Sequence, residues 1–238
     1  MKARIFLMFF LLLLGITAYG QEEDISVSRG FSLSLTSSNR GSGLESAYYV
    51  GAGRMQWAYG LDIFHVRSLH EVKVEPYPFP DRKYVFGKIN NLWVVSPSFG
   101  VNYMLSSSSS YNMVEMQGGI KIGPALGVLN PYHIKLCGQN GNCISEAFNP
   151  DIHSYQAISG RASVFSNTVD PSLRLGISLK AYVIFDFHYK IKNLTGIKLG
   201  INADLFPSSV PLVLETDDLQ NASTYLAGTI GFIFGGKW

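Results

Sequence analysis

Two cysteines offer the clearest chemistry in this sequence. Cys137 and Cys143 enclose the five residues Gly-Gln-Asn-Gly-Asn, a glycine-rich stretch that can turn back on itself. Two cysteines in an exported chain favour a disulfide, and their spacing lacks the CxxC pattern typical of zinc and redox sites. We therefore predict a disulfide between Cys137 and Cys143, worth about 2 kcal/mol to the loop that it closes.

The histidines, in contrast, form no metal-binding pattern. A zinc site needs three or four converging ligands, and two histidines four residues apart on a helix are a common source. The five histidines are instead scattered, at His65, His70, His133, His153 and His188. We predict structural or solvated roles for them, with no metal and no cofactor.

Serines near two of these histidines raise the question of nucleophilic catalysis. Hydrolases pair a serine with a histidine base, and the candidates here are Ser68, Ser163 and Ser166 with His65 or His70. No Gly-x-Ser-x-Gly motif fixes a nucleophile. We therefore predict that the protein is not an enzyme and has no catalytic residues.

The elements that must position these residues are β-strands. In residues 173–189 every odd position from Leu173 to Phe187 is apolar, whereas the positions between them include Arg174, Lys180 and Asp186. Alternation with a period of two predicts a strand, here longer than the usual five or six residues. Weaker or equal alternation marks residues 30–36, 44–53, 56–67, 93–105, 113–128, 197–205 and 223–235. The sequence thus predicts about eight strands, or ten if the loops contribute a hairpin. Residues 155–166 could add a short hairpin or extend a strand.

These strands predict an all-β fold, a closed antiparallel transmembrane β-barrel with a filled, polar lumen. Alternation alone does not say which face points inward, because a lipocalin-like barrel with an apolar interior alternates too. The polar face carries glycines such as Gly119 and Gly200, which suit the narrow lumen of eight strands. A polar network could fill that lumen from Asp62, Glu115, Lys121, Arg174, Lys180, Asp186, Lys198 and Asp204.

Residues 1–20 predict export. Lys2 and Arg4 precede ten consecutive apolar residues, and a small-residue cleavage site lies before Gln21. This is the pattern of a secretory signal peptide, and ten residues are too few to span a bilayer as a helix. Residues 21–238 would then form the barrel. Their basic and acidic residues balance, 17 of each once Lys2 and Arg4 are removed, so we predict no nucleic-acid partner.

The last strand predicts the compartment. Phe232, Phe234 and Trp238 share one apolar face of a strand that closes the sequence. An open sheet edge of this kind invites aggregation, whereas in a closed barrel the strand is paired on both sides and its apolar face meets lipid. We predict that the strand lies in the outer membrane, contacts its lipid, and carries the signal that the barrel-assembly machinery recognises.

Connection lengths predict which end of the barrel faces outward. Short connections lie near Arg54 and within residues 106–112 and 190–196, whereas long ones span about 68–92, 129–172 and 207–222. Outer-membrane barrels have short periplasmic turns and long extracellular loops. We expect the long loops to be extracellular and to offer a site for a protein partner, the apolar stretch 76–80 being one candidate.

Several short motifs resemble a known group of proteins. Residues 84–92 (YVFGKINNL), followed by 96–100 (SPSFG), residues 123–127 (GPALG) ahead of Pro131 and Tyr132, and the closing 234–238 (FGGKW) are similar to recurring motifs of outer-membrane β-barrels from the Bacteroidetes. The resemblance covers most of the chain after residue 20. It implies a fold and a compartment, and brings no assigned activity or ligand residues.

These observations predict an integral outer-membrane barrel with a non-catalytic structural, adhesion or assembly role, exerted through its outward loops. Three alternatives remain open. One is an enzyme at the barrel rim that acts on envelope lipids, and another is a narrow channel. The third is a soluble, lipocalin-like periplasmic barrel that binds a ligand in an apolar interior.

Overall fold

The computed structural model describes residues 28–76, 82–106, 114–138, 142–162, 171–187, 193–217 and 219–238. Several predictions fall outside the described residues: the signal peptide at 1–20, Ser163, Ser166 and His188, and most of the apolar stretch 76–80.

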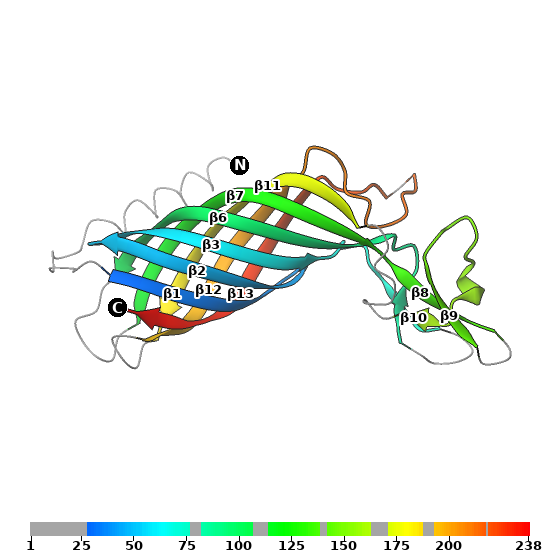
Figure 1. Ribbon diagram of the computed structural model, residues 1–238, viewed down its shortest axis with the longest axis horizontal. Helices are drawn as coiled ribbons and strands as arrows, with labels where there is room; N and C mark the ends of the chain where they lie inside the picture. Colours follow the sequence, from blue (N-terminus) through cyan, green and yellow to red (C-terminus); the bar gives the residue numbers. More distant parts are fainter. Residues whose placement is uncertain are drawn as a thin grey trace, which may run out of the picture.

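Eight strands close into an antiparallel barrel in the order β1-β13-β12-β11-β7-β6-β3-β2 (Figure 1). The barrel closes between the first and last strands, where Gly30 lies opposite Lys237. The closed eight-stranded antiparallel barrel predicted from the sequence is therefore confirmed. The strands are β1 (Ser28–Ser38), β2 (Gly41–Ala52), β3 (Met55–Val66), β6 (Asn90–Ser106), β7 (Glu115–Pro131), β11 (Ser172–Asp186), β12 (Asn193–Leu205) and β13 (Thr224–Lys237).

The alternation along each strand separates an apolar outside from a polar inside. On β11, Leu175 and Ile177 are 71% and 51% exposed, whereas Lys180 and Asp186 are buried. Eight strands enclose little space, so side chains that point inward are buried by one another. This arrangement is the opposite of a lipocalin-like barrel, whose apolar residues line an internal pocket.

Two small sheets stand at the end of the barrel away from the C-terminus (Figure 1). In the described part of residues 155–166, β10 (Gly160–Arg161) pairs with β8; residues 163–166 lie outside the described residues. No helix in the described part of the chain is long and apolar enough to cross a membrane. The additional elements are β4 (Lys73–Val74), which pairs with β5 (Tyr84–Val85), the sheet of β8 (His133–Cys137), β9 (Cys143–Ala147) and β10 (Gly160–Arg161), and the short 3-10 helix η2 (Tyr155–Ala157).

The three long connections are joined into one body, which we call the mouth unit: the described parts of residues 67–89, 132–171 and 206–223. Backbone N–H groups link them, from Ile89 to the Leu212 carbonyl at 2.9 Å, from Leu214 to Gly87 at 2.7 Å, and from Tyr132 to Ile89 at 2.7 Å. Each pair satisfies groups that would otherwise need water. The mouth unit therefore closes over this end of the barrel as a connected structure.

An apolar cluster lies where the mouth unit meets the barrel strands, in addition to the polar side chains buried inside the barrel. The connection after β12 folds back over the opening, so its apolar side chains are buried against the inner ends of the strands. Burying these side chains removes apolar surface from water. The buried cluster comprises Phe64, Val66, Leu92, Val94, Ala125, Leu129, Phe206, Val210, Leu212, Val213 and Tyr225.

Candidate functional site

Buried charges pair across the barrel interior. Lys180 on β11 donates to the Asp62 carboxylate on β3 at 2.5 Å, with the two side chains 3% and 0% exposed. Lys198 on β12 pairs in the same way with Glu45 on β2. A buried ion pair adds little net stability, because the desolvation of its two charges offsets most of their attraction. Removing one partner, however, leaves an uncompensated buried charge. These pairs thus constrain which strands face one another.

A second ionic group closes the interior toward the C-terminus. Lys237 on β13 donates to Asp186 at 2.8 Å and to Glu115 at 3.1 Å. Gln117 donates its amide to the same Glu115 carboxylate at 2.6 Å. One lysine near the end of the last strand therefore connects β13 with β11 and β7.

Lys121 and Tyr182 occupy space that two inward glycines, Gly60 and Gly119, leave open. The Lys121 side chain is 1% exposed, and its ammonium lies 5.5 Å from the centre of the Tyr182 ring, within the range of a cation–π contact. A Cβ atom at Gly60 would lie 2.9 Å from the Lys121 ammonium, and one at Gly119 would lie 2.6 Å from the Tyr182 ring. Inward glycines thus make room for large polar side chains, as the narrow lumen requires.

The structure places seven of the eight predicted lumen residues inside the barrel. They are Asp62, Glu115, Lys121, Lys180, Asp186, Lys198 and Asp204, all buried. Arg174 is a correction, because its side chain is exposed. It has the inward parity, but β11 pairs with β12 only from Ile177 onward, so Arg174 lies beyond the enclosed part of the barrel.

Two interior charges escaped the sequence analysis. Glu45 and Lys237 both point inward and pair with lysine or carboxylate partners. The sequence contained a signal for Lys237. Trp238 and Phe232 face outward, and Lys237 lies an odd number of positions from each, so it must face inward. Tyr182, which donates to Asn102 at 2.6 Å, was likewise visible as an inward position on β11.

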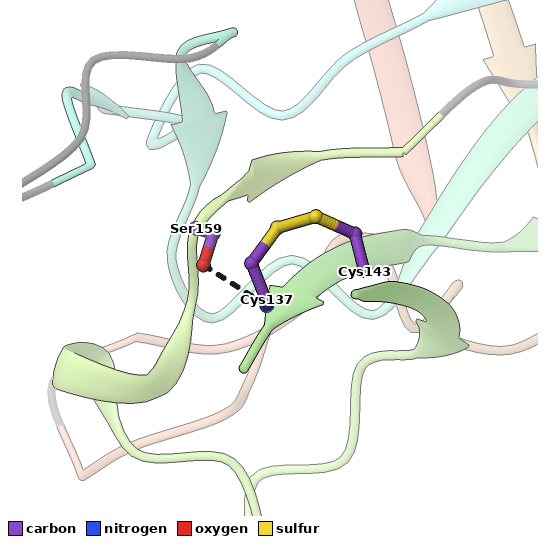
Figure 2. Close-up of a disulfide and its surroundings, with 3 residues drawn as sticks. All are labelled: Cys137, Cys143 and Ser159. Atoms are coloured by element: carbon purple, nitrogen blue, oxygen red, sulfur yellow. Dashed lines mark hydrogen bonds between the residues drawn. A yellow bond between two sulfur atoms is a disulfide. The ribbon is translucent and has the colours of Figure 1, made fainter. Parts of the chain in front are cut away.

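The two cysteines are joined at the tip of the mouth unit (Figure 2). Cys137 and Cys143 face each other as the last pair of the β8–β9 hairpin. The Cys137 backbone N–H also donates to the Ser159 hydroxyl at 3.1 Å, which ties the hairpin to the segment before β10. The bridge closes the hairpin whose inner face covers a small apolar core. That core contains Tyr84, Tyr132, Ile134, Phe148 and Ile158.

Within the described residues, Ser68, His65, His70 and His133 make contacts other than a serine–histidine pair. The Ser68 hydroxyl accepts the backbone N–H of His70 at 3.3 Å, a contact that leaves the imidazole out. His65 instead lies against the Trp93 ring, 5.0 Å between centroids. His133 contacts the Pro131 carbonyl at 3.0 Å. Among the described residues, no three His, Cys, Asp or Glu side chains gather as a metal site would require.

No protein-family model and no curated protein matches this chain. The chain is similar in structure to Neisserial surface protein A, NspA, with 8% identity, a TM-score of 0.37, and 89% of this chain and 94% of that one covered. It is also similar to Ail, the attachment invasion locus protein of Yersinia pestis, solved in complex with the heparin analogue sucrose octasulfate. Identity there is 10% and the TM-score 0.35, with 92% of this chain and all of that one covered. At these identities the likeness concerns the fold alone, and the resemblance to Bacteroidetes barrels stays a prediction.

Proposed function

We propose that the protein is an integral outer-membrane β-barrel that acts without catalysis, through the mouth unit. The observation that carries this proposal is the distribution of polarity around the barrel wall. Each of the eight barrel strands has at least two large apolar side chains exposed on the outside, and the paired charges are buried inside. Soluble monomers rarely expose continuous apolar surface on this scale. Membrane lipid is the partner that this wall fits.

The last strand supports insertion by the barrel-assembly machinery. Phe232, Phe234 and Trp238 all face outward, 68%, 42% and 62% exposed. The strand is paired with β1 on one side and with β12 on the other, so its backbone needs no water within the membrane. We propose that these aromatic residues present the assembly signal, and that residues 1–20 direct export.

The mouth unit is the part of the protein suited to contact a partner. It has its own apolar core and a disulfide at its tip, and both favour a fixed surface over a collapsed loop. A structural, adhesion or assembly role follows more readily from such a surface than catalysis does.

The filled interior argues against a channel. Ion pairs and the ring of Tyr182 occupy the lumen, and an apolar cluster closes its outer end. An ion would have to displace several buried charged side chains to pass. We therefore propose a plugged barrel that does not conduct.

The membrane proposal can be tested by gel migration of cell-envelope fractions, with and without boiling. A closed barrel resists unfolding in detergent because its strands leave no open edge. We expect the protein in the outer-membrane fraction, with migration that shifts on heating. Protease added to intact cells should cut only within the mouth unit. Recovery in the soluble periplasmic fraction without a heat shift would refute the proposal.

A further inference from the structure

A cavity of about 380 Å³ opens within the mouth unit, beside the outer end of β3. Its volume falls in the range of small-molecule sites, about 300–1,000 Å³. The cavity lies at the end of the barrel that carries the mouth unit, the end that the proposed function assigns to the cell exterior. Its walls are mostly polar or charged, and they include Ser42, His65, Asn91, Trp93 and Tyr132.

Positive charge dominates this cavity. Five cations line it, Arg67, Lys73, Lys83, Lys88 and Arg161, and Glu71 is the one carboxylate among the described lining residues. Glu71 forms an ion pair with Lys88, whose ammonium donates to the Glu71 carboxylate at 2.7 Å. Lys83 pairs with Glu75, at 2.6 Å, outside the cavity lining. Arg67, Lys73 and Arg161 therefore face the cavity with no carboxylate left on its described walls.

Two of the five cations, Lys88 and Arg161, are held in place before any ligand arrives. The Tyr132 ring has Lys88 5.7 Å from its centre and Arg161 5.9 Å from it, while the Tyr132 hydroxyl accepts the Val85 N–H at 3.0 Å. Burial is the main cause that lowers the pKa of Lys88, and the neighbouring Arg161 and Arg67 lower it further against the opposing effect of Glu71. Fixed like charges repel one another, so an anion placed among them is stabilised.

A second hollow of about 260 Å³ shares Arg67, Glu71 and Lys73 with this cavity and adds Arg40. Arg40 is itself fixed, because its Nε donates to the Leu226 carbonyl at 2.8 Å. The basic surface thus continues from the cavity toward the β1–β2 turn. This extension leaves room for a ligand larger than a single inorganic ion.

We propose that this cavity binds a phosphate ester carried on a sugar, with Arg67, Lys73 and Arg161 holding the phosphate. The guanidinium group has a planar set of donors that fits phosphate oxygens in pairs. The Trp93 ring, which is only partly buried, offers a flat apolar surface against which a sugar ring can lie. The source is either a soluble sugar phosphate or the phosphorylated sugar headgroup of an envelope lipid. This inference rests on the proposed function for its placement outside the membrane.

The first arm of the test titrates the detergent-folded full-length barrel with glucose 6-phosphate, and with glucose as the neutral control. Trp93 lines the cavity, so its fluorescence reports occupancy alongside the heat of binding. We expect glucose 6-phosphate to bind and glucose not to bind. Arg67→Gln and Arg161→Gln should each weaken binding about tenfold, the size expected for one charge-assisted hydrogen bond.

Arg174→Gln is the matched control. It removes the same charge from an exposed position on β11 and does not line the cavity. Its binding should equal that of the unaltered protein. An equal loss in Arg174→Gln and Arg67→Gln would overturn the site, because it would show a general effect of net charge.

The second arm replaces the soluble probe with bilayer discs that contain lipid A with its phosphates, against discs of phosphatidylcholine alone. A fluorescence change that needs lipid A, Arg67 and Arg161, without binding of glucose 6-phosphate, would assign the site to a lipid headgroup. No response to either probe would overturn the proposal. The heat shift of the unaltered protein and of each variant is recorded in parallel. If the unaltered protein keeps its heat shift but binds neither probe, this inference is refuted and the barrel proposal stands. Weaker binding by Arg67→Gln or Arg161→Gln with an intact heat shift supports the site, because it shows that the variant is still folded.

Discussion

The barrel interior and the mouth cavity both gather charged side chains beside aromatic rings, yet they balance their charges differently. The cavity has five cations and one carboxylate on its described walls. The interior matches four buried or partly buried lysines with five carboxylates: Lys121, Lys180, Lys198 and Lys237, with Glu45, Asp62, Glu115, Asp186 and Asp204. Three of the interior lysines, Lys180, Lys198 and Lys237, have a carboxylate partner within the set, whereas the described walls of the cavity lack carboxylates for most of its cations. The contrast separates charges that serve the fold from charges that suit a ligand.

Exposure sharpens the contrast. The partners Asp62 and Lys180 are almost wholly removed from water, so their attraction acts in a medium of low dielectric. Arg67 and Lys73 are exposed, and water screens the repulsion between them. Removing one charge should therefore lower the free energy of unfolding strongly in the interior and change it little in the cavity. The predictions that follow run from the largest expected effect to the smallest.

Lys180→Met should destabilise the barrel most. The substitution leaves the Asp62 carboxylate buried, 0% exposed, without the partner that compensates it. Breaking a buried pair in this way costs about 3–5 kcal/mol. Urea unfolding of the barrel refolded in lipid vesicles measures the free energy of unfolding.

The double variant Asp62→Leu, Lys180→Met is its control. With both charges gone, no uncompensated charge is left, and most of the lost stability should return. If the single variant Lys180→Met unfolds at the same urea concentration as the unaltered protein, the pair does not constrain the fold in the way argued here.

Gly119→Ala should cost about 1–3 kcal/mol, the usual price of overpacking. The new Cβ would lie 2.3 Å from the Asn102 amide oxygen and 2.6 Å from the Tyr182 ring, so the Tyr182–Asn102 hydrogen bond must shift. Gly228→Ala is the matched control, because no atom lies within 4 Å of the Cβ it adds. Equal unfolding free energies for the two variants would contradict the tight lumen.

The interior was more predictable from the sequence than the mouth, for a physical reason. Successive side chains of a strand point to opposite faces, so one residue known to face outward fixes the direction of all the others on that strand. That rule placed Lys180 and Asp186 inside. The same rule, applied to β2 and to the end of β13, places Glu45 and Lys237 inside.

The mouth obeys no such period. Arg67, Lys88 and Arg161 come from different parts of the chain, and only the folded connections bring them to one cavity. The burial of Phe206 and Leu212 in the apolar cluster is not predicted by the alternation either, because both residues lie in a connection between strands. Arg174 shows the opposite limit. It has the inward parity and is paired with Gly127 on β7, but pairing with β12 begins only at Ile177.

Removing the disulfide should affect the mouth unit and leave the barrel unchanged. In the variant Cys137→Ser, Cys143→Ser the hairpin loses a closed loop worth about 2 kcal/mol in a chain-entropy estimate. Hydrogen exchange of β8 and β9 should become faster, while exchange in β6 and β7 and the urea unfolding of the barrel stay the same. Faster exchange throughout the barrel would show that the two regions are not independent.

Lys73→Gln should have the smallest effect on stability, within about 0.5 kcal/mol of the unaltered protein. Lys73 is exposed and lines a cavity that holds an excess of positive charge, so its loss relieves repulsion and breaks no buried pair. The same urea titration used for Lys180→Met gives the comparison directly. A loss of stability as large as that of Lys180→Met would mean that Lys73 has a structural partner, and the distinction between a balanced interior and a one-sided cavity would fail. If Lys73→Gln keeps its stability but binds glucose 6-phosphate more weakly, the charge of Lys73 contributes to ligand binding and not to the stability of the barrel.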